Sequence, residues 1–179
     1  KSLAVKPENG DELNYEVKLK LPSGLDGYEQ LIITDQVPVG TKVAAEEDAQ
    51  LYSDGAVLNK AKLSLNAAGT LVRGDITDFT GLEGKTLTLK LKLTVTEAGK
   101  LTNPIVNEAS YWLNPKTPGD DGEEPEDTPD QETDEKTPIT DNEFTKIMVN
   151  AADKEVTSLP KTPGADDLLR YQVSIQLPD

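Results

Sequence analysis

The sequence predicts an all-β protein: an antiparallel sandwich of two sheets, then a linker, then the first strands of a second β module. Three observations support this fold class. Apolar and polar residues alternate through several runs, which is the period of a strand with one buried face. Gly, Pro, Asn and Asp, the residues that favour turns, stand at the breaks between these runs. No stretch has the apolar spacing of a long amphipathic helix.

The individual strands follow from this alternation. Residues 85–95 (KTLTLKLKLTV) place Leu or Val at every second position, and residues 11–22 (DELNYEVKLKLP) repeat the pattern. Residues 31–37 (LIITDQV) and 104–113 (PIVNEASYWL) are two further strands. Seven or more strands within residues 1–115 are typical of an Ig-like β-sandwich. Shorter strands are expected in SLAV, AVLNKAKLSL and TLVRGDI, and one short helical turn is expected in residues 44–50.

Residues 116–142 differ in composition from the predicted sandwich. Pro, Thr, Gly, Asp and Glu dominate, and residues 120–135 hold ten acidic groups and no basic one. Such a segment buries too little apolar surface to offset the entropy of ordering, so we expect an extended, self-repelling linker. A calcium or partner site is the alternative, but the scattered prolines work against a fixed ligand geometry.

Residues 143–179 repeat the start of the chain. LRYQVSIQLP (169–178) has the spacing of LNYEVKLKLP (13–22), and FTKIMV (144–149) resembles KSLAV (1–5). The repeat predicts the first strands of a second, incomplete module, and repeats of whole domains indicate an array.

Composition excludes several classes of function. The chain has no Cys and no His, which removes thiol nucleophiles, disulfides, thiolate metal sites and histidine bases. A hydrolase would need a carboxylate pair or a Ser/Lys dyad, and no such spacing is present, so we expect no enzyme and no cofactor. The net charge of −15 argues against a nucleic-acid partner, and no apolar run is long enough to span a bilayer.

Three predicted strands each aim one polar side chain at the core. Asn107 shares the apolar face of PIVNEASYWL, Asp35 that of LIITDQV, and Lys1 that of KSLAV. Taken singly, each has an ordinary explanation: a solvated strand end, a turn, or a bond to the backbone. Taken together they predict a meeting in the interior, because an isolated buried charge is costly and needs a partner.

These features resemble the isopeptide-forming domains of Gram-positive pilin backbone subunits and collagen-adhesin-type surface proteins. The resemblance is carried by Lys1 at the start of the first strand, then GDELNYEVKLKLP, YEQLIITDQVPVGT and the closing NEASYWLNP. It covers residues 1–115 and resumes at Phe144-Thr145-Lys146.

The resemblance implies a role for each of the three inward residues. Lys1 is expected to be the nucleophile, Asn107 the electrophile and Asp35 the proton shuttle of a self-formed amide cross-link. Lys146 is the corresponding candidate in the second module. Asp75 and Asp78 are weaker alternatives for the acid.

The chemistry fits a water-poor interior. Burial lowers the pKa of a lysine amine and raises the pKa of a carboxyl, so that a neutral amine and a protonated acid can coexist near neutral pH. The amine then attacks the side-chain carbon of Asn107, and Asp35 relays a proton to the departing ammonia. The reaction happens once per domain, so it is self-modification and not turnover.

The resemblance therefore implies a structural stalk module of an extracellular, cell-wall-anchored bacterial surface protein. Its partners would be neighbouring pilin or surface-protein domains, with a host matrix ligand possible in addition. The alternative is an adhesin module that binds a host matrix protein or carbohydrate. Tyr52 and Trp112 are the contact candidates for that role, although Trp112 is also expected to pack against a loop or a neighbouring domain.

Overall fold

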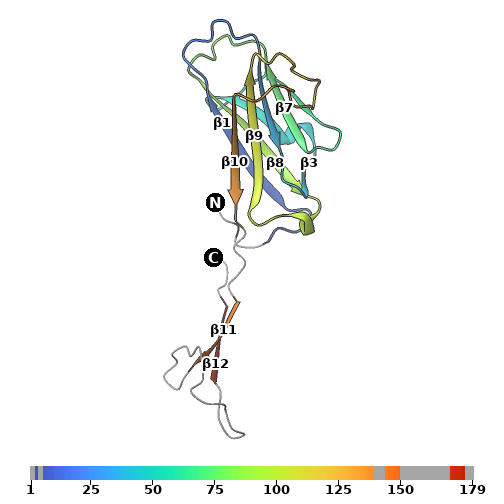
Figure 1. Ribbon diagram of the computed structural model, residues 1–179, viewed down its shortest axis with the longest axis vertical. Coiled ribbons are helices and arrows are strands. Elements are labelled where there is room, and N and C mark those ends of the chain that lie inside the picture. The colour runs from blue at the N-terminus through green and yellow to red at the C-terminus, as the bar shows by residue number, and fades with distance from the viewer. Residues whose placement is uncertain (1–2, 4–5, 139–143, 150–169, 176–179) are drawn as a thin grey trace. The chain divides into compact units, whose positions relative to one another are not determined.

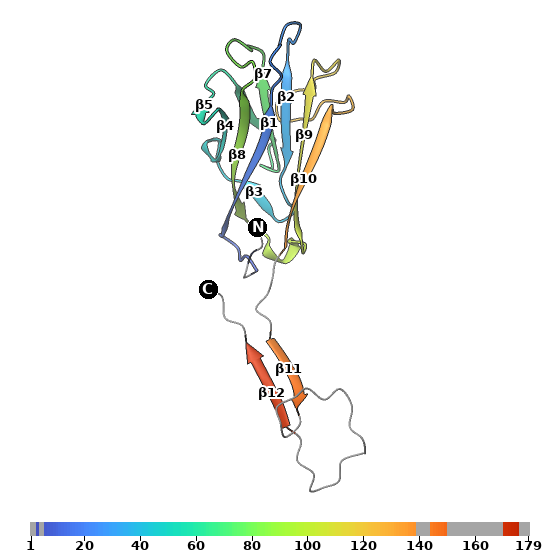
Figure 2. The same ribbon diagram turned by 90° about the vertical axis from the view of Figure 1, so that its left-hand side faces the viewer.

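The computed structural model describes residues 3, 6–138, 144–149 and 170–175 of the 179. Residues 7–138 form one compact unit, in which two antiparallel sheets pack face to face (Figures 1 and 2). The helical structure of the described residues consists of two short 3-10 turns, η1 (Glu46–Asp48) and η2 (Ala98–Lys100). Neither is long or apolar enough to cross a membrane, and this holds for every helix in the described residues. The predicted all-β sandwich is confirmed.

The first sheet has the order β1-β8-β4-β5, and β3 also pairs with β8. In its central strand β8 the alternation predicted for residues 85–95 holds, because Leu87, Leu89, Leu91 and Leu93 are almost fully buried. The short helical turn expected near residue 46 is η1. The strands are β1 (Glu12–Lys20), β3 (Thr41–Val43), β4 (Ala49–Ser53), β5 (Ala56–Val57) and β8 (Thr86–Val95).

The second sheet has the order β10-β9-β2-β7-β6. Its middle strand β2 is buried on both faces from Leu31 to Asp35, although only one buried face was expected from the sequence. One face packs on the first sheet, and the other is covered by a later part of the chain. The strands are β2 (Leu31–Gln36), β6 (Lys62–Leu65), β7 (Leu71–Ile76), β9 (Ile105–Leu113) and β10 (Gln131–Thr137).

Residues 116–138 differ from the expected solvated linker. Residues 115–130, called the strap here, contact β9, β2, β7 and β6 across the outer face of the second sheet. The chain then forms β10, which pairs with β9 along its whole length. The composition of this segment reflects its small apolar burial, but backbone and polar side-chain contacts hold it against the sheet.

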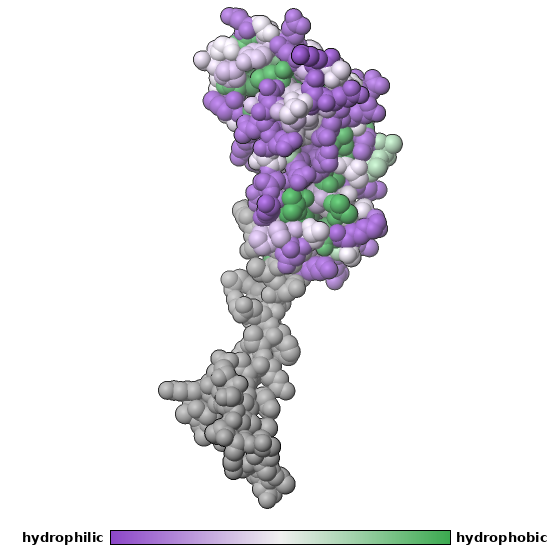
Figure 3. All heavy atoms as spheres, viewed as in Figure 1, coloured by the Kyte–Doolittle hydropathy of each residue, from purple (hydrophilic) through white to green (hydrophobic). Residues whose placement is uncertain are grey.

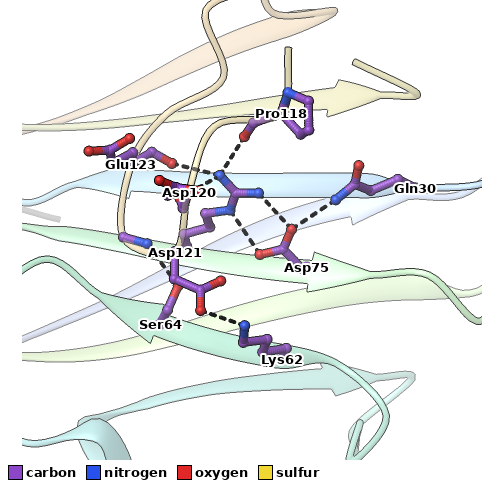
Figure 4. Close-up of polar contacts among 10 residues, drawn as sticks. Gln30, Lys62, Ser64, Asp75, Pro118, Asp120, Asp121 and Glu123 are labelled. Carbon is purple, nitrogen blue, oxygen red and sulfur yellow. Dashed lines mark hydrogen bonds and ion pairs between the residues drawn. The ribbon is translucent and has the colours of Figure 1, made fainter. Parts of the chain in front are cut away.

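Arg73 on β7 is the main anchor of the strap. Its side chain is 3 % exposed, and its Nη1 donates to the carbonyls of Pro118, Asp120 and Glu123 at 2.5, 2.9 and 3.0 Å (Figure 4). Its Nε and Nη2 form a two-pronged ion pair with Asp75, both at 2.8 Å. One guanidinium therefore satisfies three strap carbonyls and one carboxylate, an arrangement that its fixed fork of donors favours.

Two further side chains fasten the strap over β2 and β9. Glu124 accepts hydrogen bonds from Thr34 at 2.9 Å and from Gln36 at 2.8 Å, one on each carboxylate oxygen. The indole N–H of Trp112 donates to the carbonyl of Asp127 at 2.8 Å, and the ring is 4 % exposed. Trp112 thus packs under a loop, which was one of the two outcomes expected for it.

Gly122 lies where the strap passes close to the end of β6. Its φ is +75°, and a Cβ there would lie 2.8 Å from the carbonyl oxygen of Leu65. Its N–H donates to the hydroxyl of Ser64 at 3.1 Å (Figure 4). Only glycine fits both the left-handed backbone and the short contact.

The described part of residues 143–179 is a two-stranded antiparallel pair, β11 (Phe144–Val149) and β12 (Arg170–Ile175). These are the two runs that the internal repeat singled out as strands. Their assignment to a second, incomplete module remains a prediction.

The face of the sandwich seen in Figure 3 is mostly hydrophilic, with small, separate hydrophobic areas. Among the described residues, the large apolar side chains that are exposed are Val39 and Val57. Scattered exposed apolar residues are normal for a soluble domain and do not by themselves mark a binding face.

The Arg73 anchor can be tested against a surface ion pair that holds the same segment. Arg73→Ala should lower the free energy of unfolding by about 3 kcal/mol, because a buried ion pair loses one partner. Lys62→Ala removes an exposed pair with Asp121 and should cost less than about 1 kcal/mol. Guanidinium unfolding followed by fluorescence of Trp112, the single tryptophan, measures both. Equal losses in the two variants would contradict the anchor role.

Candidate functional site

Asp35 and Asn107 meet inside the sandwich. Their strands β2 and β9 are neighbours, and Asp35 stands opposite Ala109, so Asn107 lies one diagonal step away on the same face. The carboxamide Nδ2 of Asn107 donates to Asp35 Oδ2 at 2.8 Å. Asp35 is 0 % exposed and Asn107 4 % exposed. Two of the three polar side chains predicted to converge therefore do so.

The pair carries two buried oxygens without a partner among the described residues. These are Asp35 Oδ1 and Asn107 Oδ1. Buried polar atoms almost always have a hydrogen-bond partner, and leaving one unpaired is costly. The pair can therefore accept a hydrogen bond from one more donor, such as an amine, beside the contact between the carboxyl and the carboxamide.

Burial raises the pKa of Asp35 to about 7, and the hydrogen bond from Asn107 only partly opposes this. Near neutral pH the carboxyl thus exists in both protonation states. The ionised form can accept the N–H of Asn107, and the structure contains this contact. The protonated form can donate to Asn107 Oδ1 once the carboxamide turns by half a rotation, because its oxygen and nitrogen then exchange places. Asp35 can therefore act as a general acid.

Tyr15 borders the site from the other sheet. It lies on the inward face of the edge strand β1 and is half-buried. Its side chain hydrogen-bonds the side chain of Thr137 on β10. Burial raises the pKa of Tyr15, and the negative charges of Glu135 and Asp35 raise it further. Tyr15 thus lies within electrostatic reach of both carboxyls, at the open side of the sandwich between β1 and β10.

A groove of about 140 Å³ opens between these edge strands. Its floor includes the apolar side chains of Val17, Ile33 and Ala109, and its β10 side includes Glu132 and Thr133. Ala109 is also the cross-strand neighbour of Asp35, so the groove leads toward the buried pair. Within the described residues, no acidic groups are clustered in a way that could hold a metal ion.

The two alternative acids lie elsewhere. Asp75 is three positions from Val72, the cross-strand neighbour of Asp35, so it points to the opposite face of the sheet. There it binds Arg73 and Gln30 (Figure 4). Asp78 is exposed beside Lys60. Asp35 is thus the acid that contacts Asn107.

The predicted lysines are not described at the level of side chains. Lys1 lies outside the described residues, and Lys146 lies in β11, of which only the backbone pairing is described. Their roles remain predictions.

The candidates for ligand contact are not free surface aromatics. Trp112 is buried under the strap. Tyr52 is half-buried, its hydroxyl donates to Gln50 at 2.7 Å, and Lys90 Nζ lies 5.0 Å from the centre of its ring.

Sequence reasoning missed three residues around the site. The inward position of Tyr15 on β1 follows from strand alternation, which was a usable signal. Glu135 and Thr137 lie in the segment interpreted as linker, and nothing in its composition indicated a strand.

The raised pKa of Asp35 predicts a pH-dependent stability. Between about pH 4 and 7 the folded chain binds a proton that the unfolded chain has released, so stability falls as pH rises through this window. The full change is about 4 kcal/mol.

The measurement uses Lys1→Ala, which cannot form the expected cross-link, with and without Asp35→Asn. Relative to the protein that carries Asp35→Asn, the protein that keeps Asp35 should lose stability from pH 4 to pH 7.5. Its advantage at pH 4 should shrink or reverse by pH 7.5. A second Asp→Asn change at the exposed Asp26 corrects for the general loss of one negative charge. A constant difference across this range would contradict the raised pKa.

No protein-family model and no curated protein sequence matches the chain. Several solved structures do. BcpA, the major pilin subunit of Bacillus cereus, matches with a TM-score of 0.54 at 18 % identity, over 97 % of this chain and 53 % of its own. The Corynebacterium diphtheriae major pilin SpaA matches with a TM-score of 0.52 at 14 % identity, over 83 % of this chain and 36 % of its own.

The N-terminal domain of the Streptococcus gordonii adhesin Sgo0707 matches with a TM-score of 0.53 at 13 % identity, over 74 % of this chain and 29 % of its own. The chain thus spans about half of BcpA and about a third of the other two. At these identities the likeness concerns the fold, and the chain has the β-sandwich fold seen in Gram-positive pilins and a streptococcal adhesin.

Proposed function

We propose that the chain is a stalk module of a Gram-positive surface protein, and that it joins Lys1 to Asn107 by an isopeptide bond that it forms itself. The fold supports the stalk role, because its matches include two major pilins. The structure of SpaA is described as pointing to a modular pilus assembly stabilising isopeptide bonds. In this proposal the module stands outside the cell, anchored to the wall through the full-length protein, with neighbouring pilin-like modules as its partners.

The observation that carries the cross-link is the buried contact between Asp35 and Asn107. A carboxyl and a carboxamide have been placed in a dry interior, 2.8 Å apart, with one oxygen of each unpaired. For stability alone such an arrangement is unfavourable. It is suited to a reaction in which an amine enters, the carbonyl is polarised and ammonia leaves.

The proposed reaction balances as follows. The neutral amine of Lys1 attacks Cγ of Asn107, and protonated Asp35 donates its proton to the developing oxyanion at Oδ1. The tetrahedral intermediate collapses as Asp35 takes its proton back from Oδ1 and the carbonyl re-forms. The C–N bond to Nδ2 breaks, and ammonia departs with the proton that the lysine nitrogen loses. Folding supplies the proximity, which is worth about 7–11 kcal/mol of the barrier in well-aligned systems. One bond forms per module, with no turnover.

The bond would close a loop over most of the sandwich. Residues 1–107 include all strands of the first sheet together with β2, β6 and β7. In a chain without Cys, such an amide would supply a covalent constraint that thiols cannot reduce.

Intact mass measures the bond directly. Folded wild-type protein should be lighter than its sequence by the mass of one ammonia, and Lys1→Ala and Asn107→Ala should show no deficit. Asp35→Asn should lose the deficit or form it far more slowly, whereas Asp75→Asn should retain it. If folded wild-type protein has the mass calculated from its unmodified sequence, the proposed cross-link is wrong.

The bond should also appear as stability. Closing a loop of about 100 residues contributes about 4.7 kcal/mol through the unfolded state, by analogy with disulfides. Lys1→Ala should therefore unfold at a clearly lower guanidinium concentration than wild type, while a substitution at the exposed Lys18 should not. Sodium dodecyl sulfate gels of boiled samples give a second readout, because the closed loop keeps the chain more compact. If the wild-type chain shows the mass deficit but is no more stable than Lys1→Ala, loop closure does not stabilise the fold as expected.

The adhesin alternative has less support. The match to Sgo0707 concerns the fold, which serves many functions. Trp112, the stronger contact candidate, is buried beneath the strap, so loss of binding in Trp112→Ala would report unfolding of the strap as readily as a lost ligand contact.

A further inference from the structure

β10 brings a second carboxyl to the reaction site. In the ladder between β9 and β10, Glu135 stands directly opposite Asn107. Directly opposed residues share a face of the sheet, with Cβ atoms about 4.5–5.5 Å apart. Glu135 therefore lies on the inward face, beside the carboxamide that is to be attacked, at the exposed edge of the sandwich.

Tyr15 locates this carboxyl relative to the buried one. It interacts electrostatically with both Asp35 and Glu135, and it hydrogen-bonds Thr137, two residues from Glu135. The two carboxyls thus lie around the same opening between β1 and β10, one in the dry interior and one at the rim. An amine that approaches Asn107 through this opening would pass Glu135 first.

The proposed condensation has two proton requirements that one carboxyl meets poorly. A lysine begins as an ammonium ion and must lose a proton before it can attack. The carbonyl of Asn107 is activated by a protonated acid, and a protonated Asp35 cannot accept a proton at the same moment. A second carboxylate near the entering amine separates the two tasks.

We propose that Glu135 takes the proton of the incoming lysine ammonium, while Asp35 donates to Asn107 Oδ1. This inference rests on the proposed function. The proton moves from the lysine nitrogen to Glu135, the freed amine attacks Cγ of Asn107, and Asp35 protonates the oxyanion. On collapse Asp35 recovers that proton, and Nδ2 leaves as ammonia with the second proton of the lysine nitrogen. Glu135 gives its proton to solvent, so the products are the amide and an ammonium ion.

Thr137 and Tyr15 are positioning residues in this arrangement. Their hydrogen bond runs from β1 in the first sheet to β10 in the second, across the open side of the sandwich. It holds β10, and with it Glu135, against the opening. Among the described residues, β10 lies at the edge of its sheet beside β9, and this link between the sheets restricts its movement.

The test separates folding from condensation. The full chain is isolated from inclusion bodies in guanidinium chloride, where the site is not assembled, and is refolded by dilution. Trp112 fluorescence follows folding and docking of the strap, and intact mass of quenched samples follows the loss of ammonia. The rate of mass loss within the folded population is then measured from pH 5 to pH 9.

Glu135→Gln should fold as wild type does but condense about 10²-fold more slowly, the low end of the general-base range. Its rate optimum should move to higher pH, because the lysine must then lose its proton to water. Glu135→Asp should retain most of the rate. Asp134→Asn is the matched control, since Asp134 is exposed and lies on the same strand but on its outward face. This control leaves Tyr15 and Glu135, the ionisable groups around Asp35, unchanged.

Thr137→Val removes the hydroxyl that bonds Tyr15 at nearly constant size and should slow condensation about fivefold, the value of one hydrogen bond. Thr137→Ser should restore the rate. A purely structural role would change the fluorescence-detected folding rate and leave the rate of mass loss in folded protein unaltered.

The outcomes distinguish this inference from the proposed function. If wild type loses one ammonia and Glu135→Gln does so at the wild-type rate with the same pH optimum, Glu135 is not the proton acceptor and the stalk proposal stands. If Asp134→Asn slows the reaction as much as Glu135→Gln, a general effect of charge replaces the specific one. If folded wild type loses no ammonia, the cross-link and this inference both fall.

Discussion

The proposed chemistry depends on one buried polar contact, that between Asp35 and Asn107. It can exist only because β2 and β9 are neighbours and both carry their polar residue on the inward face. The interior around it is dry enough to raise the pKa of Asp35 to about 7. A carboxyl in this state is poorly suited to stabilising a fold, but it is suited to moving a proton. The burial of this pair is unfavourable for stability, but it would favour formation of the proposed amide bond.

The most polar part of the chain helps to keep that interior dry. The strap covers the outer face of β2, so this strand is shielded from water on both sides. Arg73 and Glu124 hold the strap through carbonyls and hydroxyls, with little apolar surface involved. β10 continues the cover along β9, past the residue opposite Asn107, to Thr137 opposite Ile105. An acidic, proline-rich segment thereby contributes to an apolar environment.

The strap and β10 would lie outside the part of the chain that the cross-link stabilises. A bond from Lys1 to Asn107 would enclose residues 1–107, whereas the strap and β10 follow Asn107 and stay outside the loop. β1 begins and β10 ends at the same end of the sandwich (Figures 1 and 2). In the proposed stalk, the chain would thus enter and leave residues 7–138 at the same end of the sandwich. The Arg73 anchor and the Tyr15–Thr137 bond would have to hold the part that no covalent bond secures.

The sequence by itself determined the fold class, the strands with one apolar face, and the inward direction of Asp35 and Asn107. These follow from alternation, a local property in which each residue's face is set by its neighbours in the chain. Only the tertiary structure decided that the two side chains touch, that Asp75 and Asp78 lie elsewhere, and that the supposed linker is a strap and a strand. Those features rest on backbone hydrogen bonds and on polar contacts such as that of Arg73 with Glu123, fifty residues apart. Such contacts leave no period in the sequence, because they depend on which distant segment the folded chain brings within reach.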